Sequence, residues 1–245
     1  MRKTFVLLSL LFFIAGSCLA DQRENTMINL LVPSGLVNNE MYFNISHKYY
    51  YDITKYKAED EDVFAPVTSG ANINLGLRYM IWEGIEAGFY YNGAGQEKRV
   101  SLSYNILFEE LFLRAAAYVE YFNFNNPVPL NTEQNLVYML SFQSEHLFDI
   151  VSLALNAGYD GWSQKAIAGA GVSVKFMDKY SVTGEWYPAF KNNSGGYSIG
   201  FKAVTYGHQF VFFAGNTAAQ GVRNALSGGG ETLHLGFNIQ RLISF

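Results

Sequence analysis

The 245-residue sequence contains a single cysteine, Cys18, and only five prolines. One cysteine cannot form an intramolecular disulfide, and so few prolines exclude a proline-rich stalk or linker. Charged residues make up 16%, below the roughly 25% typical of soluble domains, and the formal net charge is −4. Low charge combined with 17 Tyr, 20 Phe and 23 Gly argues against a disordered chain, a coiled coil and a basic nucleic-acid binder.

Long apolar runs are also missing after residue 20. The stretch 147–155 is interrupted by Asp149 and Ser152, and the stretch 166–174 is short and rich in glycine. A membrane-spanning helix needs ~20 predominantly apolar residues. The sequence therefore excludes a helical membrane protein.

Residues 1–20 have the pattern of a cleaved export signal. Arg2 and Lys3 precede an apolar stretch over 5–14, and small residues occupy the −3 and −1 positions of a cut after Ala20. The predicted domains are therefore a signal peptide over 1–20 and one domain over 21–245. Lipidation of Cys18 stays open as an alternative to cleavage after Ala20.

What the sequence does contain is alternation with a period of two. In 72–79, for example, Ile73, Leu75 and Leu77 alternate with Asn72, Asn74 and Gly76. Such alternation is typical of a strand with one apolar and one polar face. It predicts twelve strands, near 40–51, 71–82, 84–93, 97–107, 111–123, 135–144, 150–159, 166–176, 179–188, 196–205, 208–215 and 231–245.

The connections between these strands alternate between tight turns and longer polar loops. This is the connectivity of an outer-membrane barrel, with short periplasmic turns and longer external loops. Closure is required because an unpaired backbone group facing hydrocarbon costs several kcal/mol. We therefore predict an all-β fold, a closed antiparallel transmembrane β-barrel of about 12 strands.

A secreted β-sandwich would show the same alternation, so independent signals are needed. The export signal is one, and the terminal Phe245, which resembles the signal read by the barrel-assembly machinery of Gram-negative bacteria, is another. Outer-membrane lipid and that machinery are the predicted partners, and the bacterial outer membrane is the predicted location. The third signal is the gathering of interfacial aromatics near strand ends, at Tyr49, Tyr51, Tyr79, Trp82, Tyr91, Tyr121, Trp186, Tyr197 and Tyr206.

Two stretches carry a resemblance to a known family. Met27-Ile28-Asn29 followed by residues 41–48 resembles the opening of a family of outer-membrane barrels found mainly in Bacteroidota, with an Ile-Asn start and a strand ending in His-Arg. Residues 71–79 and 84–88 are similar to the second hairpin of that family. Lys48 stands where Arg is usual. The resemblance implies an outer-membrane barrel and brings no established activity.

No catalytic pattern emerges. Barrel phospholipases carry a His-x-Ser pair, but His208 is followed two residues later by Phe210. The other histidines, His47, His146 and His234, also lack a Ser at that spacing, and no metal-ligand spacing occurs. We therefore predict no enzyme activity, no cofactor and no bound metal.

The polar strand faces supply the candidate functional residues. Because charges facing the bilayer midplane cost roughly 2–4 kcal/mol, we expect these side chains to point into the lumen and to make it net basic. Two functions fit: a narrow pore for small solutes, or a closed structural or partner-binding barrel whose charges pair with one another. The oligomeric state is left open. The candidates are Lys48, Arg78, Glu86, Arg99, Arg114, Glu120, Lys175, Glu185 and Lys202.

Overall fold

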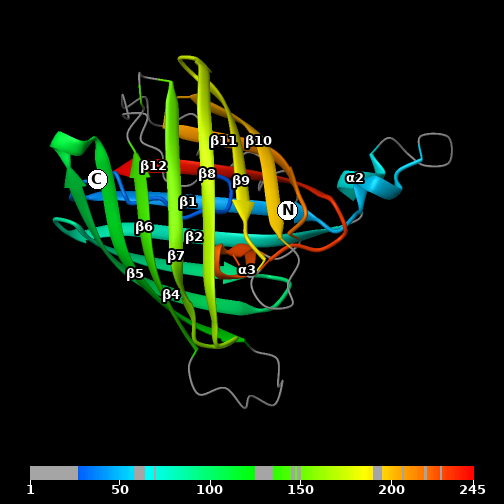
Figure 1. Cartoon of the computed structure of the whole chain (residues 1–245), viewed down its shortest axis with the longest axis horizontal. Coiled ribbons are helices and arrows are strands. Elements are labelled where there is room, and N and C mark those ends of the chain that lie inside the picture. The colour runs from blue at the N-terminus through cyan, green and yellow to red at the C-terminus, as the bar shows by residue number, and fades with distance from the viewer. Residues whose placement is uncertain are drawn as a thin grey trace, which may run out of the picture.

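The computed structural model describes residues 27–57, 64–68, 70–124, 135–144, 147, 150–189, 195–205, 207–217, 220–226 and 228–245. Its strands form one closed antiparallel barrel in sequence order, and the last strand pairs with the first (Figure 1). The predicted fold class is confirmed. The signal peptide and its cleavage lie outside the described residues and stay predictions.

All twelve predicted strands are present, with ends within a few residues of those expected. Short helices η1 (Ile53–Lys55), α2 (Ala65–Thr68), η2 (Glu109–Leu111) and α3 (Val222–Leu226) lie in the connections. The strands are β1 (Glu40–Tyr49), β2 (Ala71–Trp82), β3 (Ile85–Asn92), β4 (Glu97–Phe108), β5 (Leu113–Phe124), β6 (Leu136–Ser144), β7 (Val151–Asp160), β8 (Lys165–Met177), β9 (Tyr180–Tyr187), β10 (Gly196–Thr205), β11 (His208–Gly215) and β12 (His234–Ser244).

The two ends of the barrel differ in their connections. The short-turn end carries the connections predicted to be tight, where Gly84 and Gly207 adopt φ of 76° and 79°, a left-handed region that favours glycine. The start of β1 and the end of β12 also lie there, joined by a hydrogen bond from the Phe245 N–H to the Asn39 carbonyl at 3.0 Å. The opposite loop end carries the long connections 50–70 and 216–233, although 93–96 and 161–164 are as tight as the turns.

Outward-facing side chains are apolar and inward-facing ones polar. On β2, Leu75 and Leu77 are 40% and 38% exposed, whereas Arg78, on the opposite face of the same strand, is 4% exposed. This inverts a soluble sandwich and suits a wall that contacts lipid. Six of the predicted interfacial aromatics are exposed on this wall: Tyr79, Trp82, Tyr91, Tyr121, Trp186 and Tyr197.

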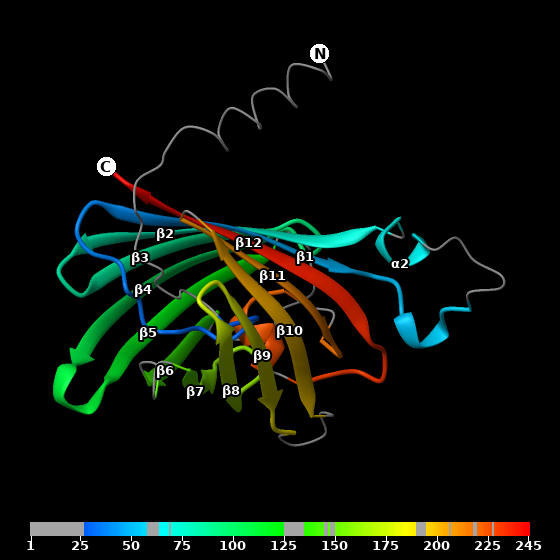
Figure 2. The same ribbon diagram turned by 90° about the horizontal axis from the view of Figure 1, so that it is seen from above.

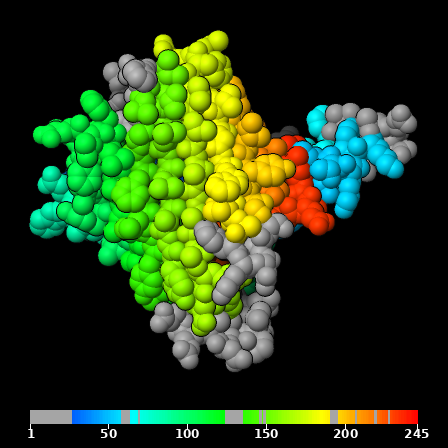
Figure 3. Space-filling view, viewed as in Figure 1, coloured from blue at the N-terminus to red at the C-terminus, as the bar shows by residue number. Residues whose placement is uncertain are grey.

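The barrel is strongly sheared, and its interior is not empty. Strands β6 to β9 run across the direction of β1, β2 and β12 on the opposite wall (Figure 1). Seen from above, α3 lies between the two walls, whereas α2 projects beyond them (Figure 2). The projection of the α2 region is also plain in the space-filling view (Figure 3). None of the described helices is long and apolar enough to cross a membrane.

Asp52 ties two loop-end connections together. Its carboxylate accepts hydrogen bonds from the Thr54 hydroxyl at 2.7 Å, the Thr54 N–H at 3.1 Å and the Leu233 N–H at 3.2 Å. These donors, the Thr54 hydroxyl first, lower the pKa of Asp52 to about 2. The ionised form that makes this contact is therefore retained as the pH falls, until the pH approaches about 2.

Phe245 follows β12 directly and is 77% exposed. Deleting it, or replacing it with Asp, should lower the amount of assembled barrel more than it lowers export, because nothing inside the barrel depends on its ring. Heat-modifiable barrel in membrane fractions, compared with total exported chain, measures the difference, and Phe245→Tyr is the conservative control. Unchanged yield of assembled Phe245→Asp would remove the assembly role from this residue.

Candidate functional site in the barrel lumen

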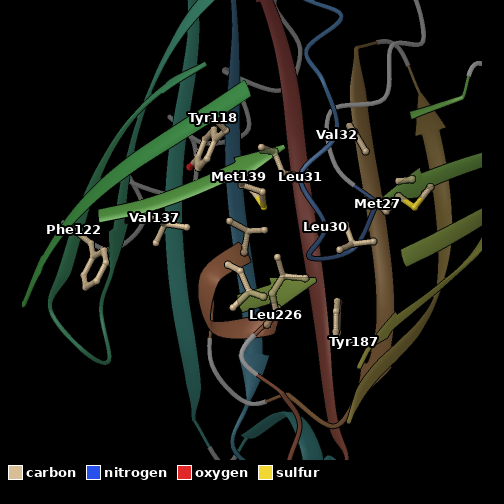
Figure 4. Packing of buried hydrophobic residues seen from close by; sticks show 14 residues of the cluster. Met27, Leu30, Leu31, Val32, Tyr118, Phe122, Val137, Met139, Tyr187 and Leu226 are labelled. Carbon is tan, nitrogen blue, oxygen red and sulfur yellow. The ribbon is translucent and has the colours of Figure 1, made fainter. Parts of the chain in front are cut away.

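Residues 27–36, called the plug segment here, lie inside the barrel. Their side chains at positions 27, 28, 30, 31, 32 and 36 are all at most 6% exposed. From the lumen the chain passes through residues 37–39 at the short-turn end and enters β1. Figure 4 shows Met27, Leu30, Leu31 and Val32 enclosed by strands of the barrel. The lumen is therefore occupied by a piece of the chain's own backbone.

Glu185, on the inner face of β9, holds the start of the plug segment. Its Oε1 accepts three consecutive backbone N–H groups, from Ile28 at 2.7 Å, Asn29 at 2.9 Å and Leu30 at 2.9 Å. Its Oε2 accepts the Asn29 side-chain amide at 3.0 Å and the Tyr187 hydroxyl. Successive N–H groups of this kind form a concave site for a negative charge. Here that charge comes from the barrel wall.

Asn156 of β7 pairs with the plug segment as a neighbouring strand would. Its Oδ1 accepts the Leu31 N–H at 3.0 Å, and its Nδ2 donates to the Leu31 carbonyl at 2.7 Å. The Ser141 hydroxyl of β6 donates to the same carbonyl at 2.8 Å. Two further main-chain contacts run from Asn238 Nδ2 to the Ile28 carbonyl and from the Ser34 N–H to Asn105 Oδ1, both at 2.7 Å.

Two glycines of β8 make room for the apolar side of the plug segment. A Cβ added at Gly171 would lie 2.5 Å from Met27 Sδ and 2.9 Å from Leu30 Cδ1. A Cβ at Gly169 would lie 2.7 Å from Leu30 Cδ2 and 2.5 Å from Leu226 Cδ2. The plug segment, the wall and α3 thus meet in one buried apolar cluster. Any larger residue at either glycine would push these side chains apart.

The loop between β11 and β12 fills the lumen from the loop end. Arg223 of α3 lies 3.3 Å from Glu97 Oε1 and 3.7 Å from Asp160 Oδ2, and its guanidinium stands 4.2 Å from the centre of the Phe122 ring. All three charged side chains are at most 7% exposed. Residues 220–226 form the second occupant of the lumen and are called the loop segment below.

The predicted lumen residues divide into two groups. Arg114 and Lys175 are half-buried near the short-turn end, at the start of β5 and the end of β8. The other seven are at most 4% exposed on inner strand faces: Lys48, Arg78, Glu86, Arg99, Glu120, Glu185 and Lys202.

Neighbouring strands pair the buried arginines with carboxylates. Arg78 Nε of β2 donates to Glu86 Oε1 of β3 at 2.5 Å. Arg99 of β4 lies 3.7 Å from Glu120 of β5, donates to Asn74 Oδ1 at 2.5 Å, and stands 4.8 Å from the centre of the Tyr90 ring. These are the two arginine–glutamate pairs that the inferred strand faces bring together. Such contacts belong to a packed interior and not to charges solvated in a wide pore.

The expected basic excess is not present among the buried, described side chains. The nine candidates count six positive and three negative charges, but the described interior adds carboxylates that the sequence reading omitted. Five buried groups are basic and six are acidic: Lys48, Arg78, Arg99, Lys202 and Arg223 against Glu40, Glu86, Glu97, Glu120, Asp160 and Glu185.

Sequence reasoning missed Glu97, Asp160 and Arg223. Glu97 could have been predicted from the sequence, because it stands two residues before Arg99 and therefore shares its strand face. Asp160 shares a face with Asn156 in the same way. Arg223 carried no such signal, since it belongs to a connection without strand periodicity.

A small polar cavity lies between the plug segment, the loop segment and β1 to β5. Its volume is about 60 Å³, and its lining includes Asn29, Asn44, Arg99, Glu120 and Gly221. Arg99 Nε, Glu120 Oε1 and Asn44 Oδ1 have no hydrogen-bond partner among the described residues. Such a cavity has the size and polarity to hold a few water-sized molecules. No cluster of three or more potential metal ligands occurs in the described part of the chain.

Two histidines of the described chain stack on phenylalanine rings, and a third lies within hydrogen-bond distance of a hydroxyl. His208 stacks on Phe210 with ring centres 6.0 Å apart, and His47 stacks on Phe237 at 4.4 Å. His234 Nε2 lies 2.7 Å from the Thr232 hydroxyl. His146 lies outside the described residues.

Solved structures with the same fold exist, although no family model and no curated protein matches the sequence. The KdgM porin aligns over 84% of this chain and 99% of its own, with a TM-score of 0.53 and 10% identity. Its complex with disordered oligogalacturonate aligns with the same coverage and identity and a TM-score of 0.54. An active-site mutant of the outer membrane phospholipase A of Escherichia coli aligns over 90% of this chain and 94% of its own at 8% identity, with a TM-score of 0.49.

The likeness to the KdgM porin shows the fold. The chain has the fold of an outer-membrane β-barrel of the porin-like type. Its resemblance to barrels of Bacteroidota stays a prediction, since no family model matches the sequence.

Proposed function

We propose that this protein is an outer-membrane channel for small solutes whose lumen is closed, in the conformation described, by the plug segment and the loop segment. The observation that carries this proposal is the plug segment itself. Its main chain is hydrogen-bonded to side chains from β4, β6, β7, β9 and β12. A barrel held shut by a separate segment can open without disturbing the wall.

The number of strands makes the barrel wide enough to contain a passage once the plug segment is displaced. Eight-stranded barrels are filled by their own wall side chains, whereas barrels of 16 strands leave an aqueous channel. With twelve strands, this barrel accommodates the ten-residue plug segment and a short helix in addition to its wall side chains. Displacing the plug segment would therefore leave a narrow passage, suited to small solutes.

Charge selectivity is a separate matter. Because basic and acidic groups nearly balance among the buried described side chains, the net basic lumen expected from the sequence, and any anion selectivity it would produce, are not part of this proposal. The passage would be limited by width, and its buried ion pairs would act mainly as structure.

A closed barrel that binds a partner through its loops is the second candidate. It is favoured by the loop that projects around α2 (Figure 3), where Phe64 is 64% exposed and Val67 41%. Exposed apolar side chains on a projecting loop are typical of interaction sites.

Conductance across planar bilayers tests the proposal. We expect chain 21–245 to show rare or no openings and the double variant Leu30→Asp, Leu31→Asp to open at least about tenfold more often, because two carboxylates in an apolar cluster cost several kcal/mol and a tenfold shift needs only about 1.4 kcal/mol. Val37→Asp, at an exposed position just outside the plug segment, is the matched control. Steady conductance of the unaltered chain, or a folded double variant that stays closed, would overturn the proposal.

A further inference from the structure

We infer that the lumen is a binding site for a short apolar peptide, which the plug segment occupies as a tethered ligand. The inference rests on the proposed function in one respect, namely that the plug segment can leave. It adds a ligand class that the channel proposal does not need. Three properties of the site carry it.

The first property is recognition of main chain. Wall side chains bind the N–H groups of residues 28, 29, 30, 31 and 34 and the carbonyls of residues 28 and 31. The Asn156 amide donates to the carbonyl and accepts from the N–H of the same residue, Leu31. At Leu31 this resembles the pairing that an added strand receives from a sheet edge, whereas residues 28–30 bend so that their N–H groups converge on Glu185. A site that binds backbone groups accepts peptides of different sequence.

The second property is a set of pockets for alternate side chains. Ile28 packs with Val211 and Phe213 in a small apolar cluster on one wall. Leu30 lies over the two glycines of β8 on another. Between them, the Asn29 side chain meets polar groups, donating to the Tyr187 and Ser198 hydroxyls at 2.9 and 3.1 Å. The site therefore selects an apolar–polar–apolar order.

The third property is the dependence of wall groups on the bound backbone. Glu185 is 4% exposed, and every hydrogen bond described for it comes from the plug segment apart from the Tyr187 hydroxyl. Asn156 is fully buried, and it bonds to the plug segment and the Ser141 hydroxyl. When the plug segment leaves, these two groups keep one wall partner each and lose the rest, and a second peptide would restore the lost hydrogen bonds.

Tethering explains why the site is closed to outside peptides in the unaltered chain. Only residues 37–39 separate the plug segment from β1. A short tether gives an effective concentration in the millimolar range or above. A free peptide therefore competes only when the plug segment has been weakened.

The test uses full-length chain 21–245 in detergent and a fluorescent, end-blocked peptide with the sequence of residues 27–36. Fluorescence anisotropy should show saturable binding to the Leu30→Asp, Leu31→Asp variant, at least about tenfold tighter than to the unaltered chain, whose tethered segment competes. Ile28→Asp, which alters a buried side chain of the plug segment and leaves every wall group in place, provides a second displaced variant. Heat modifiability establishes that each variant is folded.

Two altered peptides separate this site from general apolar adsorption. A peptide carrying Asp at the positions of Leu30 and Leu31 should not bind. A peptide N-methylated at the position of Leu31, which keeps every side chain but loses the N–H that Asn156 accepts, should bind at least about tenfold more weakly.

The site is supported if the peptide of residues 27–36 binds the displaced variants saturably and the N-methylated peptide binds them more weakly. Absence of binding to both folded displaced variants, or equal binding of the N-methylated peptide, overturns it. Failure of the peptide site is distinguishable from failure of the channel proposal, because a displaced variant that conducts but does not bind peptide contradicts only the site. An unaltered chain that conducts steadily contradicts the channel proposal.

Discussion

Replacing Glu185 with Ala should free the plug segment and make its backbone accessible from water. The substitution removes an acceptor shared by three buried N–H groups, and hydrogen bonds to a charged group contribute about 1.5–3 kcal/mol each. Because each 1.4 kcal/mol corresponds to a factor of ten, the loss of even one of these bonds should raise the exposed fraction of the segment roughly 10- to 100-fold, and the loss of all three should raise it further. The measurement is the labelling rate of Val32→Cys by a water-soluble maleimide.

The sequence makes this measurement clean, because Cys18 precedes residue 21 and chain 21–245 has no other cysteine. Glu185→Gln should give an intermediate rate, since its amide oxygen still accepts but carries no charge. Glu83→Ala removes a carboxylate from an exposed turn and should leave the rate unchanged. Equal labelling in Glu185→Ala and the unaltered chain would show that this carboxylate does not hold the plug segment.

Breaking the Arg78–Glu86 pair should have the second large effect, this time on the wall itself. Arg78→Met leaves the Glu86 carboxylate, 2% exposed, without its 2.5 Å partner. Removing one partner of a buried pair costs ~3–5 kcal/mol, whereas replacing both with apolar residues of similar volume is often neutral. The double variant Arg78→Met, Glu86→Leu should therefore recover most of the loss. Denaturant unfolding in detergent or lipid measures all three chains.

An exposed ion pair provides the control. Lys55 and Asp52 are 3.5 Å apart, with the lysine side chain 76% exposed. Exposed pairs contribute at most about 1 kcal/mol, so Lys55→Met should hardly change the free energy of unfolding. A loss below about 1 kcal/mol for Arg78→Met as well would mean that water reaches this level of the lumen in place of packed groups.

The wall of this barrel was predictable from the sequence because each strand repeats one rule. Alternation places Leu75 and Leu77 outside and Arg78 inside without reference to any other strand. The same rule puts Arg78 beside Glu86 and Arg99 beside Glu120 once the hairpins are drawn.

The contents of the lumen were not predictable by that rule. Residues 27–36 form no strand, and their partners Asn156, Glu185 and Asn238 lie far along the chain. Their meeting depends on barrel closure, a long-range event that local periodicity does not record. The Ile28-Asn29 pair was noted only as part of a resemblance, without any sign that it reaches Glu185. Arg223 was not predicted for the same reason. Its omission, together with that of Glu97 and Asp160, is why the predicted charge of the lumen differs from the observed one.

The position of the plug segment immediately before β1 has a consequence for the order of biogenesis. The barrel closes by pairing Glu40 with Ser244, at the two extremes of the strand order. Before that seam forms, the growing sheet is open along one side, and residues 27–36 can lie against its inner face as strands β4 to β9 are added. Closure then encloses a segment already in place, with no need to thread it through a finished ring. If this seam is the last pairing to form, it both completes the wall and encloses the plug segment, and a mutation that speeds seam formation should yield barrels with empty lumens.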